Sequence, residues 1–138
     1  MNKVYIDSDV ILDLLQKRHP HHENARSLFA LVETGKIKGF VSPLIFSNIF
    51  YILRKDHNSK TAVDLLIRLK MLLKIVSIGE RTIELALTSS FADFEDAIQY
   101  FAALDCKADC LVTRNKKHYR QAQIPVFLPE EFLTLHKK

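Results

Sequence analysis

The sequence has few cysteines, few glycines and no long run of apolar residues. Its 138 residues include two cysteines, three glycines, four prolines and no tryptophan. Because there is no second cysteine pair, a four-cysteine zinc site is excluded, and Cys106 and Cys110 are predicted to be buried or half-buried thiols. Asp7 and Asp9 interrupt the N-terminal apolar run. We therefore expect no signal peptide, no membrane span and a cytoplasmic location.

The composition is that of an ordinary globular protein. Hydrophobic residues make up 48% of the chain and charged residues 26%, which is enough for one core but, at this length, not for two. We therefore expect residues 1–138 to form a single domain. The net charge of +4 is small, so the positions of the basic residues are more informative than their number.

Short apolar runs typical of strands alternate with longer segments of helical periodicity. This alternation predicts an α/β fold with three layers, in which a central, mainly parallel sheet of four to five short strands lies between helices. In such a sheet ligands bind at the carboxyl ends of the strands, near the point where the strand order reverses. The expected strands are 3–6, 39–43, 74–78, 108–113 and 125–128, and the expected helices include 22–34, 44–55, 60–72, 80–88, 94–104 and 129–138.

Three aspartates follow the first expected strand, in the segment VYIDSDVILDLL. Asp7 ends the strand, where its side chain can point into the ligand crevice or cap the next helix, and the two roles are compatible. Asp9 falls in the first helical turn, where the helix dipole favours a negative charge in any case. Asp13 lies one turn further on and is expected to be solvated. Crowding carboxylates at a buried strand end is costly unless a cation compensates.

A second acidic group lies in the segment FADFEDAIQ. Asp93 is placed to cap the next helix, and Asp96 follows three residues later. On that helix Asp96 borders the apolar stripe that contains Ala97 and Leu104. A divalent metal ion shared with Asp7 would offset both desolvation and repulsion. Mg²⁺ or Mn²⁺ is the expected ion, since these ions accept few protein carboxylates and keep bound waters.

Four segments in this order, VYIDSDVILDLL, VSPLIFSNIFYIL, DFEDAIQYFAAL and CLVTRNKKHY, together resemble the PIN domain. That fold is found in metal-dependent ribonucleases that include VapC-type toxins, and the resemblance extends over nearly the whole chain. It implies a metal-dependent endoribonuclease that hydrolyses RNA phosphodiester bonds. In the family one aspartate ends the first strand and another lies on the EDA helix. Asp7 and Asp96 match these positions, which implies that they are catalytic and bind the metal.

Two positions depart from the family pattern. The family has a glutamate where this chain has Asn48, and a late acidic residue where this chain has Asn115. Both asparagines can still supply an oxygen or orient a water, so we expect them in the catalytic site, although they bring no charge. Asp9 and Asp93 are expected as further metal ligands and Glu95 as a supporting residue, if they point into the crevice.

Basic residues beside the expected crevice fit the phosphates of RNA. Arg114, Lys116 and Lys117 follow Thr113, which we expect to support the site, and Arg18 lies at the far end of the first helix. We expect these four cations to contact RNA. The alternative is that the segment TRNKKHYR is a solvated basic loop.

Two other classes of function remain open. A haloacid-dehalogenase-type phosphatase would use Asp7 and Asp9 as its Asp-x-Asp pair, although the late lysine and acidic pair of that family have no match here. A PIN domain without catalytic activity, acting as an RNA-binding or partner-binding module, would account for Asn48 and Asn115.

The resemblance also implies protein partners. VapC-like proteins are typically homodimers, and each binds a small antitoxin that covers the acidic crevice. The apolar segment LLIRLKMLLKI is compatible with a dimer face and equally with a buried core.

Overall fold

Five short strands form one sheet in the computed structural model, which describes residues 2–137. All neighbouring strands are parallel, and their order is β3-β2-β1-β4-β5. The predicted parallel sheet is therefore confirmed. The strands are β1 (Lys3–Ile6), β2 (Lys38–Val41), β3 (Leu73–Ile75), β4 (Cys110–Val112) and β5 (Val126–Phe127).

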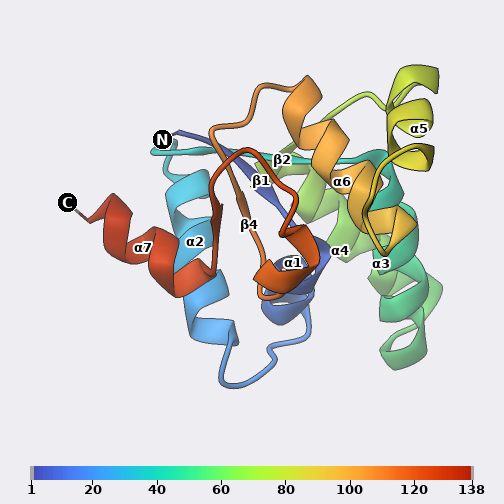
Figure 1. Ribbon diagram of the computed structural model, residues 1–138. Helices are drawn as coiled ribbons and strands as arrows, with labels where there is room; N and C mark the ends of the chain where they lie inside the picture. The colour runs from blue at the N-terminus through green and yellow to red at the C-terminus, as the bar shows by residue number, and fades with distance from the viewer. Residues whose placement is uncertain (1, 138) are drawn as a thin grey trace.

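Helices cover both faces of the sheet, as parallel strands joined by crossover connections require. Figure 1 shows α2 beside α7 at one flank of the molecule and α5 beside α6 at the other. One layer contains α1 (Ser8–Leu15), α2 (His22–Glu33), α3 (Pro43–Asp56), α4 (Ser59–Leu72) and α7 (Pro129–His136). The opposite layer contains α5 (Glu80–Leu87), α6 (Phe94–Asp105) and the 3₁₀ turn η1 (Lys116–Tyr119).

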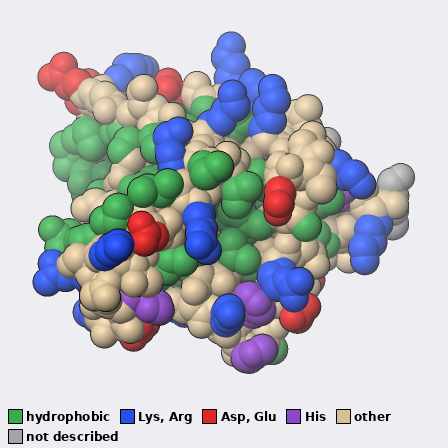
Figure 2. All heavy atoms as spheres, turned by 180° about the vertical axis from the view of Figure 1, so that it is seen from behind, with side chains coloured by type: hydrophobic (Ala, Val, Ile, Leu, Met, Phe, Trp, Pro, Cys, Tyr) green, Lys and Arg blue, Asp and Glu red, His purple; other side chains and the backbone are tan. Residues whose placement is uncertain are grey.

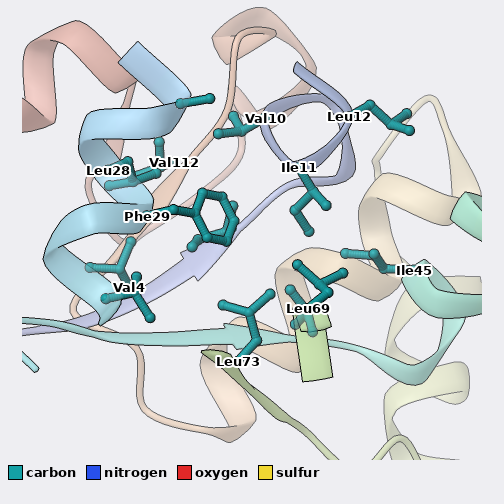
Figure 3. Packing of buried hydrophobic residues seen from close by; sticks show 14 of the residues in the cluster. Val4, Val10, Ile11, Leu12, Leu28, Phe29, Ile45, Leu69, Leu73 and Val112 are labelled. Carbon is teal, nitrogen blue, oxygen red and sulfur yellow. The ribbon is translucent and has the colours of Figure 1, made fainter. Parts of the chain in front are cut away.

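The two faces of the sheet bury separate hydrophobic cores. On β1, Val4 and Ile6 belong to the larger core, whereas Tyr5 between them faces the second. This follows from the two-residue period of a strand. In the larger core Leu28 and Phe29 of α2 pack over the sheet near Val4 (Figure 3). Each fully buried aliphatic or phenyl side chain of this kind stabilises the fold by about 1.5–3 kcal/mol.

The strand order reverses between β1 and β4. From β1 the chain builds outward through β2 and β3, and it then crosses to the other side of β1 to form β4 and β5. The register pairs Ile6 with Val112, and the amide of Asp7 donates to the carbonyl of Val112 at 3.0 Å. Asp7 and Thr113 therefore leave adjacent strands side by side, at the place where such a sheet binds ligands.

The strands after β1 have other bounds than the sequence predicted. The segments expected at 39–43, 74–78, 108–113 and 125–128 form β2 (Lys38–Val41), β3 (Leu73–Ile75), β4 (Cys110–Val112) and β5 (Val126–Phe127), and the turn η1 was expected only as a basic loop. Cys106 is half-buried and Cys110 buried, as predicted. Among residues 2–137 no helix is long and apolar enough to span a membrane.

Candidate functional site

Asp7 lies at the carboxyl end of β1, and its two oxygens have different roles. Oδ1 accepts from the amide of Ser8 at 2.8 Å, so Asp7 caps α1. Oδ2 lies 2.8 Å from the Thr113 hydroxyl and 3.1 Å from the Tyr119 hydroxyl. The side chain is only 8% exposed. The capping and crevice roles considered for Asp7 are thus both realised.

Asp96 reaches the same point from α6. The Tyr119 hydroxyl lies 3.1 Å from Asp7 Oδ2 and 3.4 Å from Asp96 Oδ1. It has one proton, so it can donate to only one of these carboxylates at a time. The structure therefore brings together two aspartates that are remote in sequence, around a tyrosine that the sequence reasoning missed. The available signal was that Tyr119 is the single tyrosine in the basic run TRNKKHYR.

Asp9 is the centre of a second set of contacts. Its Oδ2 accepts from the Asn115 side-chain amide at 2.9 Å and from the Arg114 backbone amide at 3.1 Å, and it lies 3.3 Å from the Thr113 hydroxyl. Its Oδ1 is buried and has no hydrogen-bond partner within residues 2–137. A buried carboxylate oxygen without a donor is costly, so this atom has the capacity to accept a further donor or a cation.

Asn48 holds a carboxylate in a similar way. Its side-chain amide donates to Glu95 Oε1 at 2.7 Å, which joins α3 to the first turn of α6. Each of the two asparagines expected in the site thus donates to a carboxylate from another part of the chain: Asn48 to Glu95, and Asn115 to Asp9.

Asp13 is not solvated, contrary to the sequence prediction. It is 1% exposed, and Arg114 donates to it through Nε at 2.6 Å and Nη2 at 3.2 Å. Asp13 lies three residues after the buried Val10 and therefore on the same inward side of α1. The Arg114 guanidinium is thereby committed to an internal ion pair.

The remaining predicted site residues are nearer the surface. Asp93 caps α6 by accepting from the Asp96 amide at 3.0 Å. Lys116 pairs with Glu131 at 3.0 Å. Arg18 donates to the side chain of Gln16 at 2.9 Å. The structure does not bring Arg18 into contact with the acidic crevice.

The carboxylates of the crevice are poorly neutralised. Burial, together with the charge of Asp7, raises the pKa of Asp9 to about 6. Burial and the charges of Asp7 and Asp93 raise the pKa of Asp96 to about 6 as well. The pKa of Glu95 is also raised, chiefly by burial. His118 lies 3.4 Å from Asp96, but the metal-free crevice carries more negative charge than its own cations offset.

The donor set fits a hard divalent cation. Asp7 and Asp96 offer carboxylate oxygens around one point. In the part of the chain that the structure describes, no group of three or more His, Cys, Asp or Glu side chains is placed so that it could hold a metal ion. Two carboxylates are the number through which an ion such as Mg²⁺, which keeps several waters, can bind.

Comparisons with known proteins identify the fold and the family of the chain. A family model described as the PIN domain matches residues 3–117. Ribonuclease VapC1 of Aquifex aeolicus (strain VF5) is 27% identical over 136 residues, which cover 94% of this chain and 92% of the relative. A chain in a toxin-antitoxin complex from Klebsiella pneumoniae is similar in structure, with a TM-score of 0.67 at 21% identity over 91% of this chain and 97% of that one.

A further solved structure is the sarcin-ricin loop cleaving toxin VapC20 of Mycobacterium tuberculosis, with a TM-score of 0.63 at 16% identity. It covers 78% of this chain and 86% of the toxin. These likenesses support the fold expected from the sequence, and the family model spans most of the chain. The protein therefore belongs to the PIN domain family.

Proposed function

We propose that the protein is a metal-dependent endoribonuclease of the PIN/VapC type. The observation that carries the proposal is the meeting of Asp7 and Asp96 around the Tyr119 hydroxyl, at the switch point of the sheet. The family membership and the similarity to ribonuclease VapC1 support it. They also favour it over a phosphatase of the haloacid-dehalogenase type.

PIN/VapC ribonucleases in general depend on a divalent metal ion, and for this chain we propose Mg²⁺ or Mn²⁺. Asp7 and Asp96 would hold this ion, which would supply Lewis-acid chemistry for hydrolysis of the phosphodiester. Thr113 and Tyr119 orient Asp7 by donating to its Oδ2. Asn115 orients Asp9 in the same way.

Asn48 and Asn115 stand where the family pattern has carboxylates. The side chains of Glu95 and Asp9, which lie against them, supply the negative charge that the two asparagines lack. Asn48 holds Glu95 and Asn115 holds Asp9, each by a hydrogen bond shorter than 3 Å. Asp93 has one oxygen occupied as the α6 cap and contributes mainly charge.

The substitution Glu95→Gln tests this compensation. It keeps the size of the side chain but removes the charge, so we expect affinity for Mn²⁺ to fall by about tenfold, the lower end of the effect of losing a group that supports metal ligands. Calorimetric titration measures the change. Glu84→Gln, an exposed glutamate on α5, is the matched control. Equal affinities for the two variants would contradict a role for Glu95 in the site.

The proposed activity is tested by incubating the full chain with RNA and Mg²⁺ or Mn²⁺. We expect cleavage that stops on metal chelation and falls about a hundredfold or more in Asp7→Asn, because loss of a ligand should exceed the 10–100-fold effect of losing its support. Metal-independent cleavage, or equal cleavage by Asp7→Asn, would contradict the proposal. Metal binding without cleavage would instead favour a non-catalytic RNA-binding or partner-binding module.

We also propose RNA as substrate, a small antitoxin as regulator and a homodimer of single-domain chains. The similarity to a chain in a toxin-antitoxin complex supports the antitoxin.

The surface proposed for the dimer is an apolar stripe along α4. Its residues Val63, Ile67 and Met71 are 45%, 54% and 81% exposed. Figure 2, which views the molecule from behind, shows hydrophobic side chains exposed among lysines and arginines. LLIRLKMLLKI is thus part core and part surface, since Leu69 and Leu73 are buried.

An antiparallel crossing of two α4 helices at Ile67 would make this stripe self-complementary. Val63 would face Met71 of the second copy, so that apolar side chains meet along the crossing. We expect light scattering to give twice the chain mass of 15.9 kDa for the wild type and a monomer for Met71→Asp. Leu87→Asp, at a residue 67% exposed on α5, should stay dimeric. A monomeric wild type would rule out this interface.

A further inference from the structure

A buried polar cluster lies next to the acidic crevice, inside the protein. The hydroxyls of Tyr5 and Ser42 both donate to Oε1 of Gln99, the second of them at 3.1 Å. Tyr5 and Ser42 are fully buried, and Gln99 is 2% exposed. Tyr5 lies on β1, Ser42 directly follows β2 and begins α3, and Gln99 lies on α6. The cluster therefore joins β1 and α6, the two elements that carry Asp7 and Asp96, to the start of α3.

Packing alone does not explain this cluster. The Nε2 atom of Gln99 is buried and has no acceptor within residues 2–137, and an unpaired buried donor destabilises a fold. Ser42 is at the N-cap position of α3, where a serine side chain usually accepts from the first helical turn. It makes no such bond here, since its hydroxyl donates to Gln99. A purely apolar contact between β1 and α6 would avoid both costs.

The contact between Tyr5 and Gln99 lies directly beside the meeting point of the two aspartates. Tyr5 precedes Asp7 by two residues of extended chain, so both side chains point to the face of the sheet that α6 covers. On α6, Gln99 follows Asp96 by three residues, so these two share one side of the helix. The buried contact therefore sets where α6 lies along and above β1 at the point where Asp96 has to meet Asp7.

We propose that Gln99 is a positioning residue for the metal site, and that it acts through Tyr5 and Ser42. Asp7 and Asp96 repel each other until a cation binds, and the buried hydrogen bonds of Gln99 keep α6 from moving away. Mg²⁺ accepts oxygen ligands only near about 2.0–2.1 Å, so a small shift of α6 weakens binding. The inference rests on the proposed metal-dependent function and adds residues that do not touch the metal.

The double variant Tyr5→Phe/Gln99→Met tests this role. It removes the polar contact between β1 and α6 but nearly keeps the size of both side chains, and it leaves Ser42 free to cap α3. Replacing both partners by apolar groups can be nearly neutral for stability, so we expect a Tm without metal within about 3 °C of wild type. Calorimetric titration of Mn²⁺ should show an affinity about tenfold lower, as when support for metal ligands is lost.

Two single variants make the result specific. Tyr5→Phe deletes one hydroxyl without leaving a large cavity, and it should lower Mn²⁺ affinity about threefold. Tyr100→Phe is the matched control, since it also removes a buried tyrosine hydroxyl beside Gln99. That hydroxyl accepts from the Gln123 amide at 3.0 Å and does not join α6 to β1, so affinity should change less than about twofold. A double variant with the stability and the Mn²⁺ affinity of wild type would overturn the inference.

Thermal unfolding without metal tests the same placement independently. With Asp96 held beside Asp7, Asp96→Asn relieves repulsion and should raise the Tm at pH 8 by about 3–5 °C. In the Tyr5→Phe/Gln99→Met background α6 can move away from β1, so the same substitution should raise the Tm by at most about half as much. An equal rise in both backgrounds would overturn the inference.

The two measurements separate this inference from the proposed function. A wild type that binds no Mn²⁺ would refute the metal site, whereas the unfolding experiment would still decide whether Gln99 holds Asp96 beside Asp7. Mn²⁺ binding that is equal in wild type and in the stable double variant would leave the metal site standing and refute the role of Gln99. If the double variant does not fold, Tyr5→Phe replaces it in both measurements with the same criteria.

Discussion

Replacing Asp96 by asparagine is expected to abolish metal-dependent activity while making the metal-free protein more stable. The folded-state pKa of Asp96 is about 6, above the ordinary value of 3.8, because the side chain is buried beside Asp7 and Asp93. The folded state therefore favours the protonated form. The raised pKa of Asp96 therefore contributes to the free energy of unfolding in full below pH 3.8, and this contribution is lost as the pH rises through 6. Asparagine resembles the protonated form at every pH.

The expected gain at pH 8, without metal, is about 1 kcal/mol after allowing for partial exposure of Asp96 and for the helix dipole, which favours a charge there. This corresponds to a rise in Tm of about 3–5 °C, and the gain should vanish near pH 4. RNA cleavage should fall about a hundredfold or more. The control is Asp105→Asn, which changes an exposed aspartate at the other end of α6. It should cause neither the gain of about 1 kcal/mol at pH 8 nor the hundredfold loss of RNA cleavage. A metal-free Asp96→Asn protein less stable than wild type at pH 8 would contradict the account of a repulsive crevice.

Arg114→Ala is expected to be the most destabilising surface-loop substitution. It leaves the Asp13 carboxylate, which is 1% exposed, without its bidentate partner. Breaking a buried ion pair in this way typically costs about 3–5 kcal/mol, so we expect thermal unfolding to show a Tm lower by about 10 °C or more. Any loss of RNA binding in this variant would then report a disordered site and not a lost phosphate contact.

Two comparison variants make the interpretation specific. Lys116→Ala breaks an exposed pair with Glu131 and should cost about 1 kcal/mol or less. Asp13→Leu combined with Arg114→Met removes both charges and should recover most of the stability lost in Arg114→Ala. A double variant as unstable as Arg114→Ala would show that packing, not the unpaired carboxylate, explains the loss.

Local sequence patterns were sufficient for much of the fold. Strands of two to four residues could be located because they are apolar and lie between helices of clear periodicity, as with β1 and α1. Periodicity placed Asp96 beside the buried side of α6, but only part of the expected apolar stripe is buried. Ala97 is buried, whereas Leu104 is 39% exposed, and Gln99, Tyr100 and Ala103 are buried as well. Asp7 could be placed because a parallel sheet presents its strand ends together.

The sequence could not reveal which side chains meet across the sheet. Arg114 contacts Asp13 over a separation of 101 residues, and Tyr119 contacts Asp7 over 112. Periodicity describes one element at a time, whereas these contacts depend on β4 lying next to β1. Asp13 therefore looked like a solvated helix residue, and Tyr119 went unnoticed. The internal pairing of Arg114 and Lys116 was hidden for the same reason, so all the basic residues of the segment looked equally available.

Calorimetric titration of Mn²⁺ into the wild-type chain at pH 7.5 and at pH 5 is the most direct test of the claim that Asp7 and Asp96 form a metal site. Since the pKa of Asp96 is about 6, protons compete with the metal at pH 5 and not at pH 7.5. We predict saturable binding at pH 7.5 that is at least several-fold weaker at pH 5 and is lost in Asp96→Asn. No saturable binding at pH 7.5, or equal binding by wild type and Asp96→Asn, would contradict the claim.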